Sequence, residues 1–146
     1  MKTYLRSTFQ PARFAVSNEK GHTVMVEGKP EHGGSDSAPS PTELLMMSQA
    51  GCTAIDVTTL LKKMRQSIIN MEIESSASRT PGQIPDVLDA LHLHFRMYGE
   101  VDPAKAEKAI RMSINQYCPI SKMIDHVTNI SYSFEVLDES LFAPAT

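Results

Sequence analysis

The chain has 146 residues, of which 41% are hydrophobic and 21% are charged, ordinary values for one soluble globular domain with a buried core. The net charge of −3 gives no electrostatic reason to expect nucleic acid or an anionic membrane as a partner. The N-terminal residues have neither signal-peptide nor transit-peptide character, and no apolar run approaches the roughly 20 residues of a membrane span, so we expect a cytoplasmic protein.

The N-terminal third of the chain is predicted to form strands. Residues 14–16 and 23–26 are rich in β-forming side chains, and residues 17–21 between them have the composition of a turn. A polar loop follows from Gly28 to Pro39 and holds three of the seven glycines. We expect this loop to be exposed and mobile.

A long helix is predicted next, because Ser40-Pro41-Thr42-Glu43 forms a capping box with proline at the first helical position. The helix should run to about Arg65, with basic residues near its end that suit the helix dipole. Its apolar residues go nearly all the way round, and a helix of that kind must be covered on every side. The pattern therefore favours a dimer, in which a second subunit helps to cover the helix.

The rest of the chain alternates between strand and helix patterns. Ile69, Met71 and Ile73 alternate with polar residues, as expected of a half-buried strand over residues 69–77, and residues 91–97 repeat the pattern. Asp102 is the predicted N-cap of a helix, Cys118-Pro119 begins a shorter one, and residues 130–136 form a last strand. This order predicts an α+β fold with an antiparallel sheet.

The chain has only two cysteines, Cys52 and Cys118, which lie 66 positions apart. A structural disulfide is not expected in a reducing compartment, and two thiols are too few for an all-cysteine zinc site. Cys52 lies halfway along the apolar helix, directly after Gly51, whereas Cys118 lies at a helix N-terminus, where the dipole favours a thiolate. Two buried and inert thiols are the alternative interpretation.

Other polar residues are weaker candidates. Asp56 follows Cys52 by four residues and shares its helical face, where a bare carboxylate would disfavour the thiolate unless it had a cationic partner of its own. Alternatively, Asp56 faces solvent or a subunit interface. His92 and His94 have a spacing that can bind zinc, but their alternation with Arg96 indicates a solvated strand face, and we predict no metal.

Two sequence blocks resemble the OsmC-like family, which includes the organic hydroperoxide resistance proteins. The blocks run from Ala38 to Arg65 and from Gln116 to Lys122, and residues 127–136 also resemble the last strand of the family. The resemblance implies one OsmC-like domain over residues 1–146, folded as an α+β intertwined homodimer around the cysteine-bearing helix. It implies that Cys52 is the peroxidatic cysteine and Cys118 the resolving cysteine, that an external dithiol reduces their disulfide, and that no cofactor is needed.

One feature departs from the family pattern. Characterised hydroperoxide reductases of the family have a glutamate ten residues before the first cysteine, paired with an arginine from the N-terminal region, but Thr42 stands at that position here. Glu43 would lie on the opposite side of an ideal helix from Cys52 and roughly 13 Å along its axis. Asp56, Glu43 and Arg13 are therefore only candidate supporting residues, with Lys20 and His22 as other sources of positive charge.

Three functions are consistent with these observations. The first is a thiol-dependent peroxidase that reduces organic hydroperoxides through Cys52 and Cys118. The second is a non-enzymatic dimer of the same fold that senses oxidation or binds a small apolar ligand, which the absence of the glutamate–arginine pair favours. The third is a structural protein with inert thiols. The cysteine pair and the extent of the resemblance favour the peroxidase.

Overall fold

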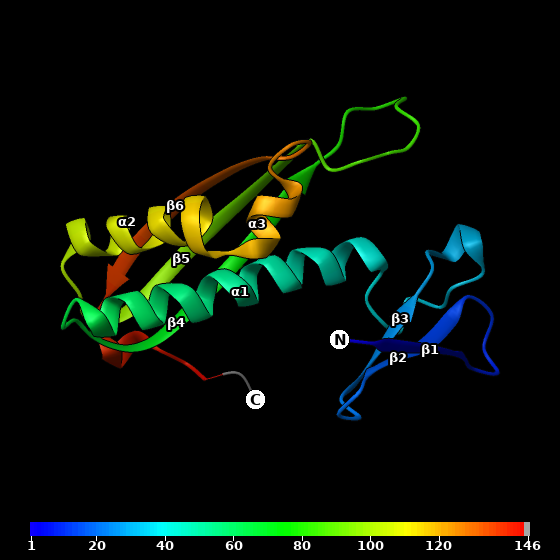
Figure 1. Ribbon diagram of the computed structural model, residues 1–146, viewed down its shortest axis with the longest axis horizontal. Coiled ribbons are helices and arrows are strands. Elements are labelled where there is room, and N and C mark those ends of the chain that lie inside the picture. Colours follow the sequence, from blue (N-terminus) through cyan, green and yellow to red (C-terminus); the bar gives the residue numbers. More distant parts are fainter. Residues whose placement is uncertain (145–146) are drawn as a thin grey trace. The chain divides into compact units, whose positions relative to one another are not determined.

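The computed structural model describes residues 1–144, and the chain divides by its own contacts into two compact units, Met1–Met47 and a second that begins at Ser48 (Figure 1). The first unit contains a three-stranded sheet, and the second contains another three-stranded sheet with its helices. The α+β class is confirmed. A single domain over residues 1–146 stays a prediction.

The sheet of the first unit is antiparallel, in the order β1 (Thr3–Ser7), β2 (Arg13–Asn18) and β3 (Thr23–Glu27). The last two strands were predicted, and their turn is held by Asn18, whose side-chain oxygen accepts hydrogen bonds from two backbone amides. The first strand was missed. All of its residues are exposed, so the sequence has no alternation there to reveal it.

The loop from Gly28 to Pro39 is mostly exposed, as predicted, but it is tied to a buried carboxylate. Glu27 accepts hydrogen bonds from the backbone amide and the hydroxyl of both Ser35 and Ser37, at 2.6–3.1 Å. A short helix, η1 (Pro30–His32), lies within the loop. The backbone of Gly34 lies so close to the backbone of Gly28 that a Cβ at Gly34 would be 1.7 Å from the Gly28 carbonyl oxygen, so only glycine fits at Gly34. The loop is thus a folded cradle around Glu27.

The long helix α1 (Pro41–Lys63) begins with the predicted capping box. The Ser40 amide donates to the Glu43 carboxylate at 2.7 Å, and the Glu43 amide donates to the Ser40 hydroxyl at 3.3 Å. The helix ends two residues before the predicted Arg65, which has a left-handed backbone with φ of 59°. By length and composition alone α1 could cross a membrane, a property that core helices of soluble proteins share.

The second sheet has the order β4 (Ser67–Ser78), β5 (Ala90–Glu100) and β6 (Asn129–Leu137). The prediction of an antiparallel sheet is right for β4 and β5 but wrong for β6, which pairs parallel to β5. The reason is the connection between them, which consists of α2 (Pro103–Met112), η2 (Ser113–Tyr117) and α3 (Pro119–Ile124). Such a crossover returns the chain to the start of the neighbouring strand. A short helix, η3 (Glu139–Leu141), follows β6.

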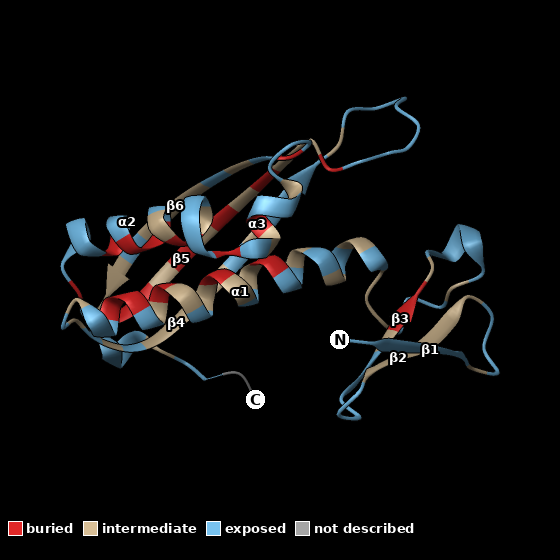
Figure 2. Cartoon of the chain, viewed as in Figure 1, coloured by how far each residue is buried: buried red, intermediate tan, exposed pale blue. Residues whose placement is uncertain are grey.

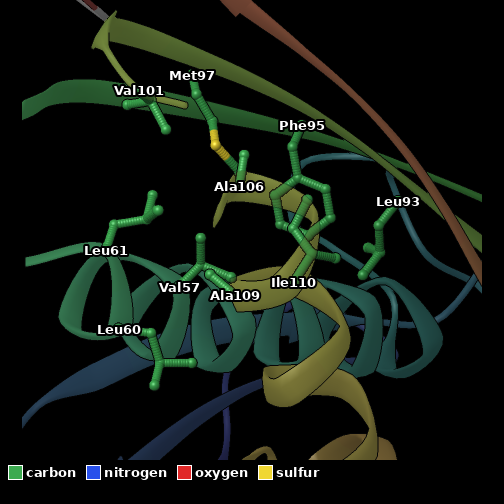
Figure 3. Close-up of a cluster of buried hydrophobic side chains, with 10 residues drawn as sticks. All are labelled: Val57, Leu60, Leu61, Leu93, Phe95, Met97, Val101, Ala106, Ala109 and Ile110. Carbon is green, nitrogen blue, oxygen red and sulfur yellow. The ribbon is translucent and has the colours of Figure 1, made fainter. Parts of the chain in front are cut away.

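The hydrophobic core of the second unit lies between the sheet and the helices α1 and α2 (Figures 2 and 3). The predicted inward face of β5 is confirmed, since Leu93, Phe95 and Met97 are all fully buried. They pack against apolar residues of both helices, which are Val57, Leu60, Leu61, Ala106, Ala109 and Ile110. This packing fixes the part of α1 that follows the cysteine.

Strand β4 departs from the predicted alternation at one residue. The pairing with β5 shifts between Ile68 and Asn70, so the chain has a β-bulge there. A bulge adds one residue to one strand and changes which side chains face inward. Ile68 therefore packs against the core while Ile69, predicted on the buried face, is exposed.

Candidate active site

The two cysteines, far apart in the sequence, meet in the second unit. The two sulfur atoms and a carboxylate oxygen of Asp56 all lie within 4.8 Å of one another. Cys118 is buried, with 2% of its surface exposed, whereas Cys52 is half-buried. Both are free thiols, and the Cys52 thiol donates a hydrogen bond to the Cys118 sulfur. The pair is therefore in direct contact, with Cys52 as the more accessible member.

The backbone around Cys118 explains how its sulfur reaches Cys52. Helix α2 continues into η2, a single turn of π-helix, and the Cys118 amide donates to the carbonyl oxygen of Ser113 at 2.8 Å. Pro119 then begins α3, with Cys118 as its N-cap. The Cys118 sulfur accepts a hydrogen bond from the Ser121 amide at 3.3 Å. Single π-helical turns recur at functional sites, and this one directly precedes the buried thiol.

A buried polar network surrounds Cys118. The Gln49 side-chain amide donates to the hydroxyls of Thr53 at 3.2 Å and Ser121 at 3.1 Å. The Thr53 hydroxyl also lies 2.9 Å from the Gln49 carbonyl oxygen, to which it donates. All three side chains are fully buried. The network ties α1, which holds Cys52, to α3, which follows Cys118.

Hydrogen bonding makes Cys118 the more acidic thiol of the pair. Burial acts to raise the pKa of the Cys118 thiol, but hydrogen bonds, chiefly from Cys52 and from the hydroxyl and amide of Ser121, outweigh burial and lower that pKa. Hydrogen bonds to a charged form favour that form. The helix-end argument from the sequence therefore had the right direction for Cys118.

The pKa of the Cys52 thiol is shifted in the opposite direction, upward. Burial raises the pKa of the Cys52 thiol to about 11, aided by the hydrogen bond and charge of Cys118 and by the charge of Asp56, against a hydrogen bond from the Ile120 amide. The carboxylate effect has the direction predicted from the i, i+4 spacing. None of these contributions comes from a cation, so the described residues supply Cys52 with no such stabilisation among its largest influences.

Asp56 belongs to the cysteine cluster. Its carboxylate is half-buried and accepts a hydrogen bond from the Ser113 hydroxyl at 3.0 Å, which orients it toward the sulfurs. Two thiols and one carboxylate have the donor atoms of a thiophilic metal site. They number one fewer than the four ligands of structural zinc and equal the three protein ligands of catalytic zinc.

The other two supporting candidates have partners within the first unit. Glu43 is held in the capping box, and its hydrogen bonds with Ser40 lower the pKa of its carboxyl group. The Arg13 guanidinium donates to the side chains of Gln10, at 2.5 Å, and Ser37, at 2.9 Å. These partners hold both side chains near the start of α1 or beside the loop that precedes it, and a supporting role for either residue stays a prediction.

The two histidines of β5 have partners on both ring nitrogens. His92 hydrogen-bonds to the hydroxyls of Ser131 and Ser133 at 2.8 Å, and His94 contacts Ser133 at 2.8 Å and Glu135 at 3.3 Å. These partners lie on β6, in register with β5. The face is a polar ladder between two strands, in agreement with the interpretation from alternation.

Comparison with known proteins now identifies the family. A family model described as OsmC-like protein matches residues 33–133, a span that contains both cysteines and more than half of the chain. The chain belongs to the OsmC-like protein family. Protein YhfA of Escherichia coli K12 is 31% identical over 125 residues, which are 85% of this chain and 90% of YhfA.

Solved structures of other proteins share the fold. A hypothetical protein from Aquifex aeolicus VF5 superposes with a TM-score of 0.82 at 25% identity, covering 94% of this chain and 96% of that one. The organic hydroperoxide resistance protein OhrB of Bacillus subtilis superposes with a TM-score of 0.67 at 17% identity, covering 92% and 96%. At that identity, the similarity to OhrB is evidence for a shared fold alone.

Sequence reasoning missed the residues that hold Cys118. Gln49 and Thr53 are polar residues at i, i+4 in an apolar helix, a pattern that signals a buried hydrogen bond. Ser121 is the third helical residue after an N-cap, where a backbone amide normally bonds to the cap side chain. Both signals were present, but nothing local indicated that the segments would meet.

Proposed function

We propose that this OsmC-like protein is a thiol-dependent peroxidase that reduces organic hydroperoxides with Cys52 and Cys118. The observation that carries the proposal is the contact between the two thiols, which brings together cysteines from α1 and from the start of α3. A sulfenic acid beside a second thiol condenses to a disulfide and thereby escapes further oxidation. Solved structures of proteins named for organic hydroperoxide resistance share this fold.

The two thiols suit different steps. Cys52 is the more exposed, so a hydroperoxide can reach it, and its sulfur attacks the O–O bond and becomes a sulfenic acid. Cys118 is buried against Cys52 and is the resolving thiol, which expels hydroxide from the sulfenic acid to form the disulfide. An external dithiol then restores both thiols by thiol–disulfide exchange.

The test is a single turnover of the reduced protein with one equivalent of an organic hydroperoxide. Stopped-flow thiol titration and intact mass should show loss of both thiols within seconds and a mass decrease of about two daltons, the two hydrogens lost with the disulfide. Cys52→Ser should abolish rapid hydroperoxide consumption, and Cys118→Ser should stop at a trappable sulfenic acid. Thiols that persist for minutes in the native protein would refute the peroxidase.

A second candidate is supported by a groove beside α1. An open cavity of about 470 Å³ lies between α1 and β4, lined in part by Ile55 and Ile69, both more than half exposed. A non-enzymatic OsmC-like protein could bind a small apolar ligand there. Saturable binding of an apolar fluorophore, unchanged in Cys52→Ser and combined with slow thiol oxidation, would favour this function over the peroxidase.

We also propose that the protein acts in the cytoplasm as a homodimer. Several large apolar side chains of the second unit stay exposed in one chain, among them Ile55, Ile69, Met123 and Val127. Exposed apolar surface of this kind is common at subunit interfaces. Sedimentation velocity should give twice the chain mass, and Ile55→Arg should shift the species toward the monomer. A monomeric native protein would contradict the homodimer.

A further inference from the structure

The sulfur of Cys118 is the meeting point of several hydrogen-bond donors. The Ser121 amide donates to it at 3.3 Å, and the Ser121 hydroxyl and the Cys52 thiol also donate to it. A neutral thiol is a weak acceptor, whereas a thiolate accepts several hydrogen bonds well. The surroundings of Cys118 are therefore those of an anion held by neutral donors.

Gln49 determines where the Ser121 hydroxyl proton points. Its amide nitrogen donates to the Ser121 oxygen at 3.1 Å, so the serine proton must point elsewhere, and Cys118 is the acceptor that it reaches. The Gln49 side-chain oxygen is buried and has no hydrogen-bond partner within residues 1–144. A buried unpaired carbonyl is costly, and its presence is explained if the donor end of Gln49 is required.

Cys52 lacks comparable support. Among the largest influences on its pKa, the hydrogen bond from the Ile120 amide is the one that lowers it, while the titratable groups in that set, Cys118 and Asp56, both carry negative charge when ionised. A second anion beside the Cys118 thiolate is opposed by both. When the pair loses one proton, these hydrogen bonds favour the negative charge on Cys118 and the remaining proton on Cys52, directed at Cys118.

Building on the proposed peroxidase function, we propose that Cys118 is also the catalytic base that accepts the Cys52 proton during the attack, and that Ser121 and Gln49 are positioning residues for this role. The family pattern uses a glutamate–arginine pair beside the first cysteine, and Thr42 stands at the glutamate position here. In this chain the second cysteine supplies the deprotonation within the thiol pair itself.

The proton then follows a closed path. As Cys118 takes the Cys52 proton, the Cys52 sulfur bonds to the terminal oxygen of the hydroperoxide, the O–O bond breaks and an alkoxide leaves. Cys118 returns the proton to the alkoxide, which departs as the alcohol, and is again a thiolate. This thiolate attacks the Cys52 sulfenic acid, forms the disulfide and releases hydroxide. One hydroperoxide is reduced by two electrons from the two sulfurs, and the net charge is unchanged.

The decisive experiment separates the first step from disulfide formation. Sulfenic acid formation at Cys52 is followed by rapid quench and mass spectrometry in the full chain and in Cys118→Ser, from pH 6 to 10. We expect the first step in Cys118→Ser to be at least tenfold slower at pH 7 and to recover as the pH rises. A Cys118 that acts only in resolution would leave the first step unchanged at every pH, which overturns the proposal.

A second measurement needs no hydroperoxide and so stands if the peroxidase function fails. The ultraviolet absorbance of thiolate is titrated in Cys52→Ser, in which the serine hydroxyl still donates to Cys118 and only Cys118 titrates. Adding Ser121→Ala or Gln49→Met should move this titration to higher pH, while Ser121→Thr, which keeps the hydroxyl, should largely restore it. Ser140→Ala, an exposed serine on η3, is the matched control. Equal titrations in all variants would overturn the positioning roles.

Discussion

Replacing Asp56 by asparagine should make Cys52 more reactive. Asparagine has nearly the same shape, and its side-chain oxygen can still accept the hydrogen bond from Ser113 that Asp56 accepts at 3.0 Å. The substitution therefore removes the negative charge and retains the local geometry. Since the Asp56 charge raises the pKa of the Cys52 thiol, its removal lowers that pKa and increases the thiolate fraction near neutral pH.

The size of the effect follows from Coulomb's law. Charges on Asp56 and Cys52 lie within 4.8 Å of each other, which gives about 0.9 kcal/mol in a water-like dielectric and about 3.5 kcal/mol at an effective dielectric of 20. Both residues are half-buried, and Asp56 is the smallest of the main influences on Cys52, so the lower figure is appropriate. It corresponds to roughly a fivefold increase in thiolate.

The assay is site-resolved alkylation of reduced protein with iodoacetamide at pH 7 to 8, quantified by peptide mass spectrometry. Cys52 should be alkylated about fivefold faster in Asp56→Asn than in the native protein. Glu107→Gln is the matched control, because it removes the same charge from an exposed site on α2. A slower reaction in Asp56→Asn would refute the reasoning and would indicate that Asp56 itself accepts the Cys52 proton.

Three further predictions concern stability. Hydrogen bonds from Ser35 and Ser37 lower the pKa of Glu27 to about 2, so the stability that its carboxylate contributes is present above the ordinary value of 4.5 and is lost as pH falls toward 2. Glu27→Gln should therefore be less stable than the native protein at pH 7, and the difference between their urea midpoints should shrink as the pH falls from 4.5 toward 2. Phe95→Ala should lose about 3–5 kcal/mol of unfolding free energy in urea, and a loss below 1 kcal/mol would contradict the assigned core. Asp102→Ala should lose about 1 kcal/mol through the missing N-cap, with Asp102→Asn as the control that keeps the cap.

Local features were predictable where local chemistry decides the structure. The capping box at Ser40, the N-cap at Asp102 and the inward face of β5 each depend on residues within one or two helical turns or on strand alternation, and all are confirmed. The parallel pairing of β6 depends instead on how a whole crossover packs, and the bulge at Ile69 depends on the partner strand. Neither leaves a periodic signal in the sequence.

The same division applies to the candidate site. Resemblance singled out Cys52 and Cys118, and helix spacing added Asp56, because these clues lie within short segments. The acidity of the two thiols was not predictable in the same way, since it arises from hydrogen bonds between α1 and α3 across 72 positions, from Gln49 to Ser121. The sequence led us to look for a cation near Cys52, whereas the structure shows neutral hydrogen-bond donors that lower the pKa of Cys118.

The buried side of α1 has a polar part beside the thiols and an apolar part in the core. Gln49 and Thr53, at its middle, form the polar network beside Cys118, while Val57 and Leu61, one and two turns later, pack into the core with β5. Because the helix connects the two regions rigidly, the core sets the position of Cys52 without touching its thiol. A change at Phe95 should therefore lower stability without moving the thiolate titration, whereas a change at Gln49 should move the titration. Residues that affected both equally would show that thiol acidity and core packing are one cooperative unit.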